Sequence, residues 1–336
     1  MRKLFLIPLM IVMVCGLIFG GCAKPAPAPA PAPKPEPIVL KGVAFLPPDR
    51  DTVIGLKTLA DMINEKAKGE LIIDVLGGPE VIGMFDQPEA CRDGTVDIIL
   101  TPTAFYGAIV PEALAFPVSE YEAWEERDIG FYDWMVELHK EKGLFYLGRT
   151  QNNFGFKLYS NKRVDTPQDI VGQKLGITPL WMPFTEALGA AGVLTEEPEI
   201  YTALERGVID GYILPEVAAM ELGVAEITKY GVDHPFYYAC NLVHVVNLDT
   251  WNRLPKHLQD LMIDQSIKLE HDMWDFYGEC LAEAQRENEA AGIEYITFSP
   301  DDAKSYLDLA YSSYWEDVRG KITPEAYTKL REFLTK

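Results

Sequence analysis

Apolar residues follow two different spacings along most of the chain. Short runs rich in strand-forming residues cover 39–45, 71–76 and 95–100, and between them, at 54–68 and 87–92, apolar residues recur every three or four positions. The first spacing is typical of strands and the second of amphipathic helices. Strands that alternate with helices predict an α/β fold with mainly parallel sheets.

The same alternation returns in the second half of the chain. We expect helices at 122–142, 183–188 and 200–206 and strands at 144–148, 156–159, 175–177 and 209–212. The two halves are similar in kind, but no fixed-period repeat is present, which excludes a solenoid. About 300 residues follow Ile38, enough for two lobes.

One predicted helix is much longer than the others. Between Pro255 and Gly292 the apolar residues keep helical spacing, and Gly278 is the only residue there that commonly breaks a helix. At a rise of about 1.5 Å per residue the helix would approach ~55 Å, longer than one lobe is wide. We expect it to span both lobes; the alternative is two helices broken near Gly278.

The N-terminus has the pattern of an export signal. Two basic residues follow Met1, an apolar run extends over 4–19, and small residues precede Cys22. Because the run is shorter than the ~20 residues of a membrane-spanning helix, we expect a cleaved signal peptide over 1–21. The Pro- and Ala-rich segment 22–37 is expected to be an extended tether.

The residues before the expected cleavage site, Phe19-Gly20-Gly21-Cys22, resemble a bacterial lipobox. The resemblance implies that Cys22 carries lipid and anchors the protein to a bacterial membrane. Phe19 stands where the motif usually has Leu, and a plain cleaved signal with an incidental cysteine is the alternative. The tether has too few apolar groups to join a core, which favours the anchor.

The chain is strongly acidic. It has 51 Asp and Glu against 30 Lys and Arg, a net charge of −21, and loss of Arg2 and Lys3 with the signal makes it −23. This charge disfavours nucleic acid and anionic lipid as partners. Beyond Cys15 and Cys22 three cysteines remain, at 91, 240 and 280, without C-x-x-C spacing, which argues against a disulfide framework.

Motifs of catalysis and metal binding are missing from the sequence. It contains no G-x-S-x-G, H-E-x-x-H, Walker-type, G-x-G-x-x-G or EF-hand motif, and its five histidines form no ligand-spaced pair. We therefore expect no catalytic residue, no metal and no cofactor.

Six segments carry a family resemblance through their joint order and spacing. They are 65–71, 76–79, 92–98, 165–174, 199–211 and 246–255, and they are spread over nearly all of 39–336. In this order they resemble the solute-binding subunits of tripartite ATP-independent periplasmic (TRAP) transporters of the dicarboxylate-binding DctP type.

The resemblance implies a two-lobed, type II-like periplasmic binding protein fold, with two hinge strands and a long helix crossing both lobes. Residues 38–153 plus 242–281 would form lobe I, and 154–241 plus 282–336 lobe II. The implied function is to capture a small organic molecule in the cleft between the lobes and to deliver it to the TRAP permease subunits. The alternatives are a binding protein of another importer, a chemosensory module, or a periplasmic enzyme on the same fold.

Two carboxylate-binding positions of the family are altered in this chain. The family holds a substrate carboxylate with the Arg that ends a G-x-K-x-R motif, because a guanidinium pairs bidentately with a carboxylate. Here the motif ends at Gly176, and an Asn often found three residues after the D-G glycine is replaced by Leu214. We therefore expect an organic acid bulkier or more apolar than succinate, in a cavity enlarged beside Gly176.

Other residues near these positions are candidates for contacting the ligand. The aromatic residues could line the cavity or belong to the lobe core. Either Arg149 or Lys157 could replace the missing arginine, with amides between them. In lobe II and the hinge the candidates are Arg149, Gln151, Asn152, Asn153, Phe154, Phe156, Lys157, Trp181, Phe184 and Tyr212.

Lobe I should contribute residues that follow its strands, because α/β sites form beyond the carboxyl ends of strands. These are Phe45, Asp49 and Arg50 after the first strand and Thr101, Thr103 and Tyr106 after the third. Glu197 and Glu216 flank the same region. If either carboxylate faced the cavity, a ligand with an amine or several hydroxyls would suit it.

Overall fold

The computed structural model describes residues 36–150, 155–237 and 242–336. Residues 37–336 form one compact unit, separate from the segment up to Glu36. The predicted positions Cys22, Gln151, Asn152, Asn153 and Phe154 lie outside the described residues. Among those described, no helix combines the length and the apolar character needed to cross a membrane.

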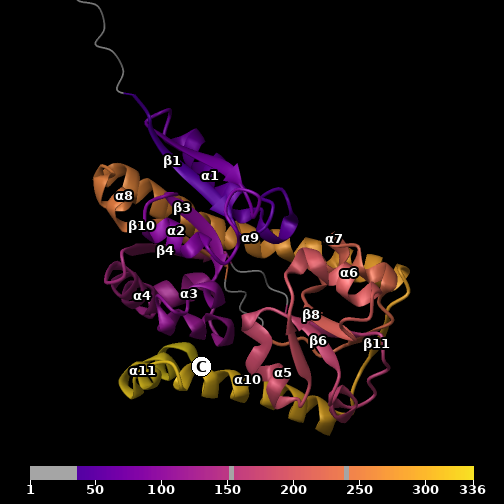
Figure 1. The fold of residues 1–336 in the computed structure, drawn as a ribbon. Helices are drawn as coiled ribbons and strands as arrows, with labels where there is room; N and C mark the ends of the chain where they lie inside the picture. Colours follow the sequence, from indigo (N-terminus) through magenta and orange to yellow (C-terminus); the bar gives the residue numbers. More distant parts are fainter. Residues whose placement is uncertain (1–35, 151–154, 238–241) are drawn as a thin grey trace, which may run out of the picture. The chain divides into compact units, whose positions relative to one another are not determined.

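The first sheet has five strands in the order β2-β1-β3-β10-β4 (Figure 1). Their bounds are β1 Ile38–Ala44, β2 Leu71–Gly77, β3 Ile98–Pro102, β4 Leu144–Thr150 and β10 Leu242–Asn247. β1 runs parallel to β2 and β3, whereas β10 runs antiparallel to β3 and β4. Helices α1 (Gly55–Lys66), α2 (Gln87–Arg92) and α4 (Phe131–Lys140) pack against it.

The second sheet has six strands in the order β11-β9-β5-β8-β6-β7. Their bounds are β5 Lys157–Ser160, β6 Lys174–Ile177, β7 Ala191–Leu194, β8 Gly211–Leu214, β9 Tyr230–Val232 and β11 Glu294–Ile296. Helices α5 (Met182–Ala187), α6 (Ile200–Glu205) and α7 (Glu216–Glu221) belong to this half. β6 is parallel to both neighbours, and β5 is antiparallel to both of its own.

The sheets are more mixed than the sequence predicted. All antiparallel pairs between described strands involve β5 or β10. Each of these two strands follows a strand of the other sheet with no helix in the described residues between them, β5 after β4 and β10 after β9. Two strands of one sheet are usually parallel when a helical crossover connects them. A strand that enters from the other sheet has no such crossover and can pair antiparallel with its neighbours.

The helix predicted over 122–142 is two helices. α3 (Ala123–Asp128) and α4 are separated by Gly130, whose φ of 82° lies in the left-handed region. Glycine adopts that region at little cost, so the chain can turn there and start a second helix.

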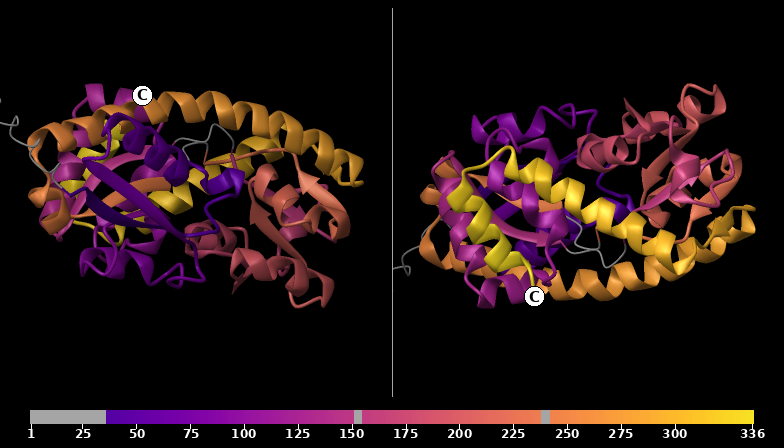
Figure 2. Two further views of the ribbon diagram at one scale, coloured as in Figure 1. Left: turned by 90° about the horizontal axis from the view of Figure 1, so that it is seen from above. Right: turned by 90° about the horizontal axis from the view of Figure 1, so that it is seen from below.

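The long helix is confirmed. α9 extends over Lys256–Ala290, 35 residues, and Gly278 does not interrupt it (Figure 2). It packs against α1 and β4 from the first half of the fold and against α7 from the second. Polar anchors hold both ends: Ser266 Oγ donates to the Leu147 carbonyl (3.3 Å), and Asn288 Nδ2 donates to the Glu216 carbonyl (3.1 Å).

The end of the chain returns toward the first half. α10 (Pro300–Arg319) contacts α5 and the 3-10 helix η3 (Pro111–Val118), and α11 (Pro324–Leu334) contacts η3 and α10. The Glu120 amide donates to the Leu334 carbonyl (2.9 Å), and Lys336 Nζ lies 3.0 Å from Glu125 Oε2. The last helix thus contacts residues that we assigned to lobe I, and the division into lobes stays a prediction.

Candidate functional site

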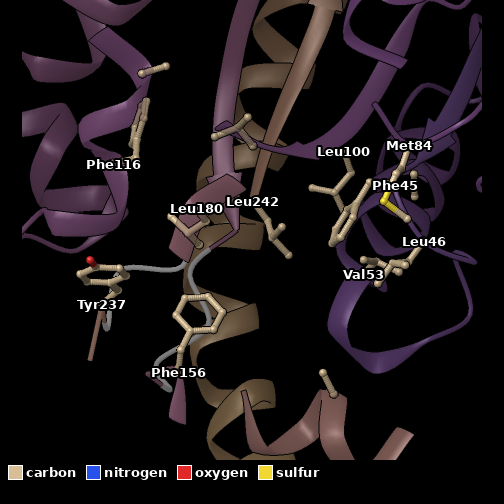
Figure 3. Packing of buried hydrophobic residues seen from close by; sticks show 14 of the residues in the cluster. Phe45, Leu46, Val53, Met84, Leu100, Phe116, Phe156, Leu180, Tyr237 and Leu242 are labelled. Carbon is tan, nitrogen blue, oxygen red and sulfur yellow. The ribbon is translucent and has the colours of Figure 1, made fainter. Parts of the chain in front are cut away.

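A small, mostly apolar cavity lies where segments of the two sheets meet. Twelve described residues line it: Phe45, Thr52, Pro102, Phe105, Phe156, Thr178, Leu180, Trp181, Glu197, Pro215, Ala218 and Leu242. Figure 3 shows four of them, Phe45, Phe156, Leu180 and Leu242. The cavity volume is about 50 Å³. One water occupies about 30 Å³ in the liquid, so the lining must move to admit an organic ligand.

The lining residues come from strand ends. Phe45 directly follows β1, Pro102 ends β3 and Leu242 begins β10, which is antiparallel to β3. On the second sheet, Thr178 directly follows β6 and Pro215 directly follows β8. The cavity therefore lies beyond the carboxyl ends of β1, β3, β6 and β8, where α/β proteins form their sites.

Aromatic rings dominate the walls of the cavity. Phe156 and Trp181 pack edge to face with ring centroids 5.1 Å apart, and Phe45 and Phe105 do the same at 5.9 Å. Trp181 is 3% exposed, and its Nε1 has no hydrogen-bond partner in the described part of the chain. An indole N–H can only donate, so Trp181 keeps one buried donor without a partner among the described residues.

Among the described residues that line the cavity, only Glu197 has an ionisable side chain. It lies half-buried in the 3-10 helix η6 (Glu197–Glu199). The pKa of Glu197 is raised to about 7. Burial is the main cause, Arg50 nearby opposes it, and Glu221 adds to it. The carboxyl group is therefore balanced between its neutral and charged forms near neutral pH.

Glu221 joins the two halves of the fold beside this cavity. Its carboxylate accepts hydrogen bonds from the Thr52 amide (3.1 Å) and from Thr52 Oγ1. Thr52 belongs to the 3-10 helix η1 (Asp51–Val53) after β1, whereas Glu221 ends α7. Burial raises the pKa of Glu221, and the two bonds from Thr52 lower it.

Neither of the predicted replacement cations lines the cavity among the described residues. Arg149 is 1% exposed and makes a bidentate ion pair with Glu126. Lys157 Nζ lies 2.9 Å from both Glu216 and Asp233, and 4.6 Å from the ring centroid of Tyr295. Both cations therefore have protein carboxylates as partners, and the Glu216 carboxylate is paired with Lys157.

Gly176 does not open the expected extra volume. It lies in β6 between β7 and β8, and a Cβ placed on it would come within 2.8 Å of Ile209 Cδ1. The space next to this glycine is thus filled by the Ile209 side chain.

Three other predicted contacts lie in the core and not on the cavity wall. Tyr212 stacks on Tyr159 with centroids 4.9 Å apart, and its hydroxyl lies 2.9 Å from Thr228 Oγ1. Leu214 is fully buried in β8. Tyr106 is 1% exposed, with its hydroxyl 3.1 Å from His139 Nε2. For Tyr212 the core alternative is the one that the structure shows.

Four of the candidates named from the sequence do line the cavity: Phe45, Phe156, Trp181 and Glu197. Sequence reasoning missed Thr52, Phe105, Leu180 and Ala218, which follow strands at a distance of one turn or more. Thr178 could have been found, because it comes directly after a predicted strand. The others depend on how the turn after each strand folds.

The chain matches the family model of DctP, bacterial extracellular solute-binding protein, family 7, over residues 43–318. A monocarboxylate 2-oxoacid-binding periplasmic protein of Nostoc is 25% identical over 293 residues, 81% of this chain and 77% of that protein. A TRAP periplasmic solute-binding protein of Desulfovibrio salexigens, solved with orotic acid, has a TM-score of 0.78 at 19% identity and covers 88% of this chain and 98% of that one.

DctP7 of Bordetella pertussis, an extracytoplasmic solute receptor binding pyroglutamic acid, has a TM-score of 0.76 at 17% identity, and the match covers 89% of this chain and 99% of that one. These likenesses give the chain the two-lobed fold of TRAP solute-binding proteins. With the family model matched over most of the sequence, this chain belongs to the DctP family of bacterial extracellular solute-binding proteins.

Proposed function

We propose that this protein captures a small organic acid in the cavity between its two sheets and delivers it to the permease subunits of a TRAP transporter. The observation that carries the proposal is the aromatic cavity itself, which lies beyond four strand ends and is lined from both halves of the fold. The similarity of the whole chain to receptors of a 2-oxoacid, of orotic acid and of pyroglutamic acid supports the ligand class.

The preferred acid is bulkier or more apolar than succinate. None of the described residues on the cavity wall is Lys or Arg, and four of them are aromatic. A dianion would have to leave water without a cationic partner, which is costly, whereas an apolar body gains from contact with the rings. A monocarboxylate has one charge to accommodate instead of two.

The protein works in the periplasm or elsewhere outside the cytoplasm, held at a membrane by lipid on Cys22. The compact unit begins at Pro37, so the tether can carry it clear of the lipid surface. Capture and delivery then depend on the lobes opening and closing about the cavity.

A thermal-shift screen tests the proposal directly. A ligand that binds only the folded state stabilises it by mass action, so the melting temperature rises with the logarithm of ligand concentration above Kd. We expect aromatic and branched monocarboxylates to raise it and succinate to leave it nearly unchanged. Tight binding of succinate, or stabilisation by polyols alone, would contradict the proposed ligand class.

A further inference from the structure

Besides the hydroxyls of Thr52 and Thr178, the described lining residues carry two polar side-chain groups, and neither is a cation. Trp181 Nε1 is a buried donor with no partner in the described part of the chain, and Glu197 is a carboxyl group on the same wall. A ligand oxygen is the natural partner of the indole N–H. An ionised Glu197, however, would repel the carboxylate of an organic acid.

Burial favours the neutral form of Glu197, whereas the charges around it act in both directions. Arg50, next to η1, favours the ionised form, and Glu221 on α7 favours the neutral form to a smaller extent. On its own turn, Glu196 and Glu199 are exposed. Burial is the largest effect and raises the pKa of Glu197 to about 7. A carboxylate ligand placed beside it would raise the pKa further, because like charges disfavour ionisation.

We propose that Glu197 takes up one proton from solvent when the acid binds, and that its carboxyl O–H and the Trp181 Nε1–H together hold the ligand carboxylate in place of the family arginine. This inference rests on the proposed function. Two carboxyl groups that share one proton form a strong, charge-assisted hydrogen bond. The protein would thereby bind an anion without placing a fixed cation in an apolar cavity.

This arrangement makes affinity depend on pH in one direction. Below the pKa of Glu197 the proton is already in place, and affinity should be nearly constant. Above it, binding must include protonation, and affinity should fall about tenfold for each pH unit. A ligand that presented an ammonium group to ionised Glu197 would show the opposite slope.

Calorimetry on the purified full chain tests this inference. Suitable probes are benzoate, pyroglutamate and 4-methyl-2-oxopentanoate, which stay ionised between about pH 6 and pH 9. We expect at least one to bind at about pH 6 and to weaken as pH rises. At about pH 8, titrations in buffers with different ionisation enthalpies should show uptake of close to one proton.

Three variants separate the roles of the residues. Glu197→Gln keeps a neutral donor at every pH, so it should bind at about pH 8 as well as the wild type does at about pH 6. Trp181→Phe keeps a ring but loses the N–H, and affinity should fall roughly tenfold at every pH. Glu196→Gln, one position away and exposed, is the control and should keep the wild-type pH profile.

The possible failures are distinguishable. Binding of a probe that does not change with pH, or that strengthens as pH rises, would overturn proton uptake while leaving the proposed function intact. A Glu197→Gln variant with the wild-type pH profile would do the same. If no probe binds at any pH, the proposed ligand class fails and this inference fails with it.

Discussion

Arg149 and Glu126 face each other in a buried bidentate ion pair, with Nε–Oε2 2.9 Å and Nη2–Oε1 2.7 Å. The same guanidinium donates to the Tyr121 carbonyl at 2.9 Å. Arg149 thus ties β4 to α3 and to the turn before it. These contacts lie within the first half of the fold, and a part for Arg149 in ligand binding stays a prediction.

Replacing Arg149 should destabilise the protein. Arg149→Ala leaves Glu126 buried without its partner, so we expect the free energy of unfolding to fall by about 3–5 kcal/mol. Urea denaturation measures this. Arg163→Ala is the control, because its ion pairs with Asp165 and Glu294 are exposed, and it should cost at most about 1 kcal/mol. If Arg149→Ala kept its stability but lost ligand affinity, Arg149 would be a ligand-binding residue instead.

The Thr52–Glu221 contact should hold the unliganded lobes together. Glu221→Ala removes both hydrogen bonds from Thr52, so the open form should become more populated. Small-angle scattering should show a larger radius of gyration for the free variant than for the free wild type, and saturating ligand should reduce it. Glu226→Ala, which changes an exposed glutamate near the same helix, is the control. Equal radii for Glu221→Ala and wild type would exclude this role.

An arginine at position 176 should not restore dicarboxylate binding. Gly176→Arg forces the Ile209 side chain aside, and we expect a loss of about 1–3 kcal/mol in the free energy of unfolding. The double variant Gly176→Arg with Ile209→Ala provides room and should recover part of that loss. Urea denaturation and calorimetry with succinate are the measurements. Tight succinate binding by the single variant would show that the side chain reaches the cavity after all.

Glu197 should make stability decline as pH rises. Its folded pKa of about 7 lies above the unfolded value, so the folded state binds more protons between the two, and stability is lost as pH rises through this window. Glu197→Gln removes the effect. The difference in melting temperature, variant minus wild type, should increase as pH rises from about 5 to about 8. A difference between the two proteins that stays constant with pH would mean that Glu197 is already ionised in the folded state.

The anchor prediction concerns Cys22. Cys22→Ser should release the protein from the membrane fraction of the producing cells, and labelling with a fatty-acid analogue should disappear. A chain that starts at Ile38 should bind the same ligands with unchanged affinity, because the compact unit begins at Pro37. Reduced affinity of that shorter chain would give the tether a part in binding.

The strands and helices were predictable where a regular apolar period decided them. α2 has the predicted bounds, and α9 continues through Gly278 because its buried side chains pack on both sides of that residue. The site was less accessible to sequence reasoning. Nothing in the local sequence shows that Arg149 would find Glu126, 23 positions earlier, or that Ile209 would fill the space beside Gly176. Long-range partners of this kind depend on tertiary packing.

The length of α9 has a consequence for how the protein unfolds. Met262 and Leu269 belong to its half beside β4, while Ala284 and Asn288 are buried in its half beside α7. Unfolding of either half would disrupt α9, and the other half packs against the same helix. Calorimetric melting should therefore show one cooperative transition, with equal calorimetric and van't Hoff enthalpies, instead of the two steps of a protein whose domains melt independently.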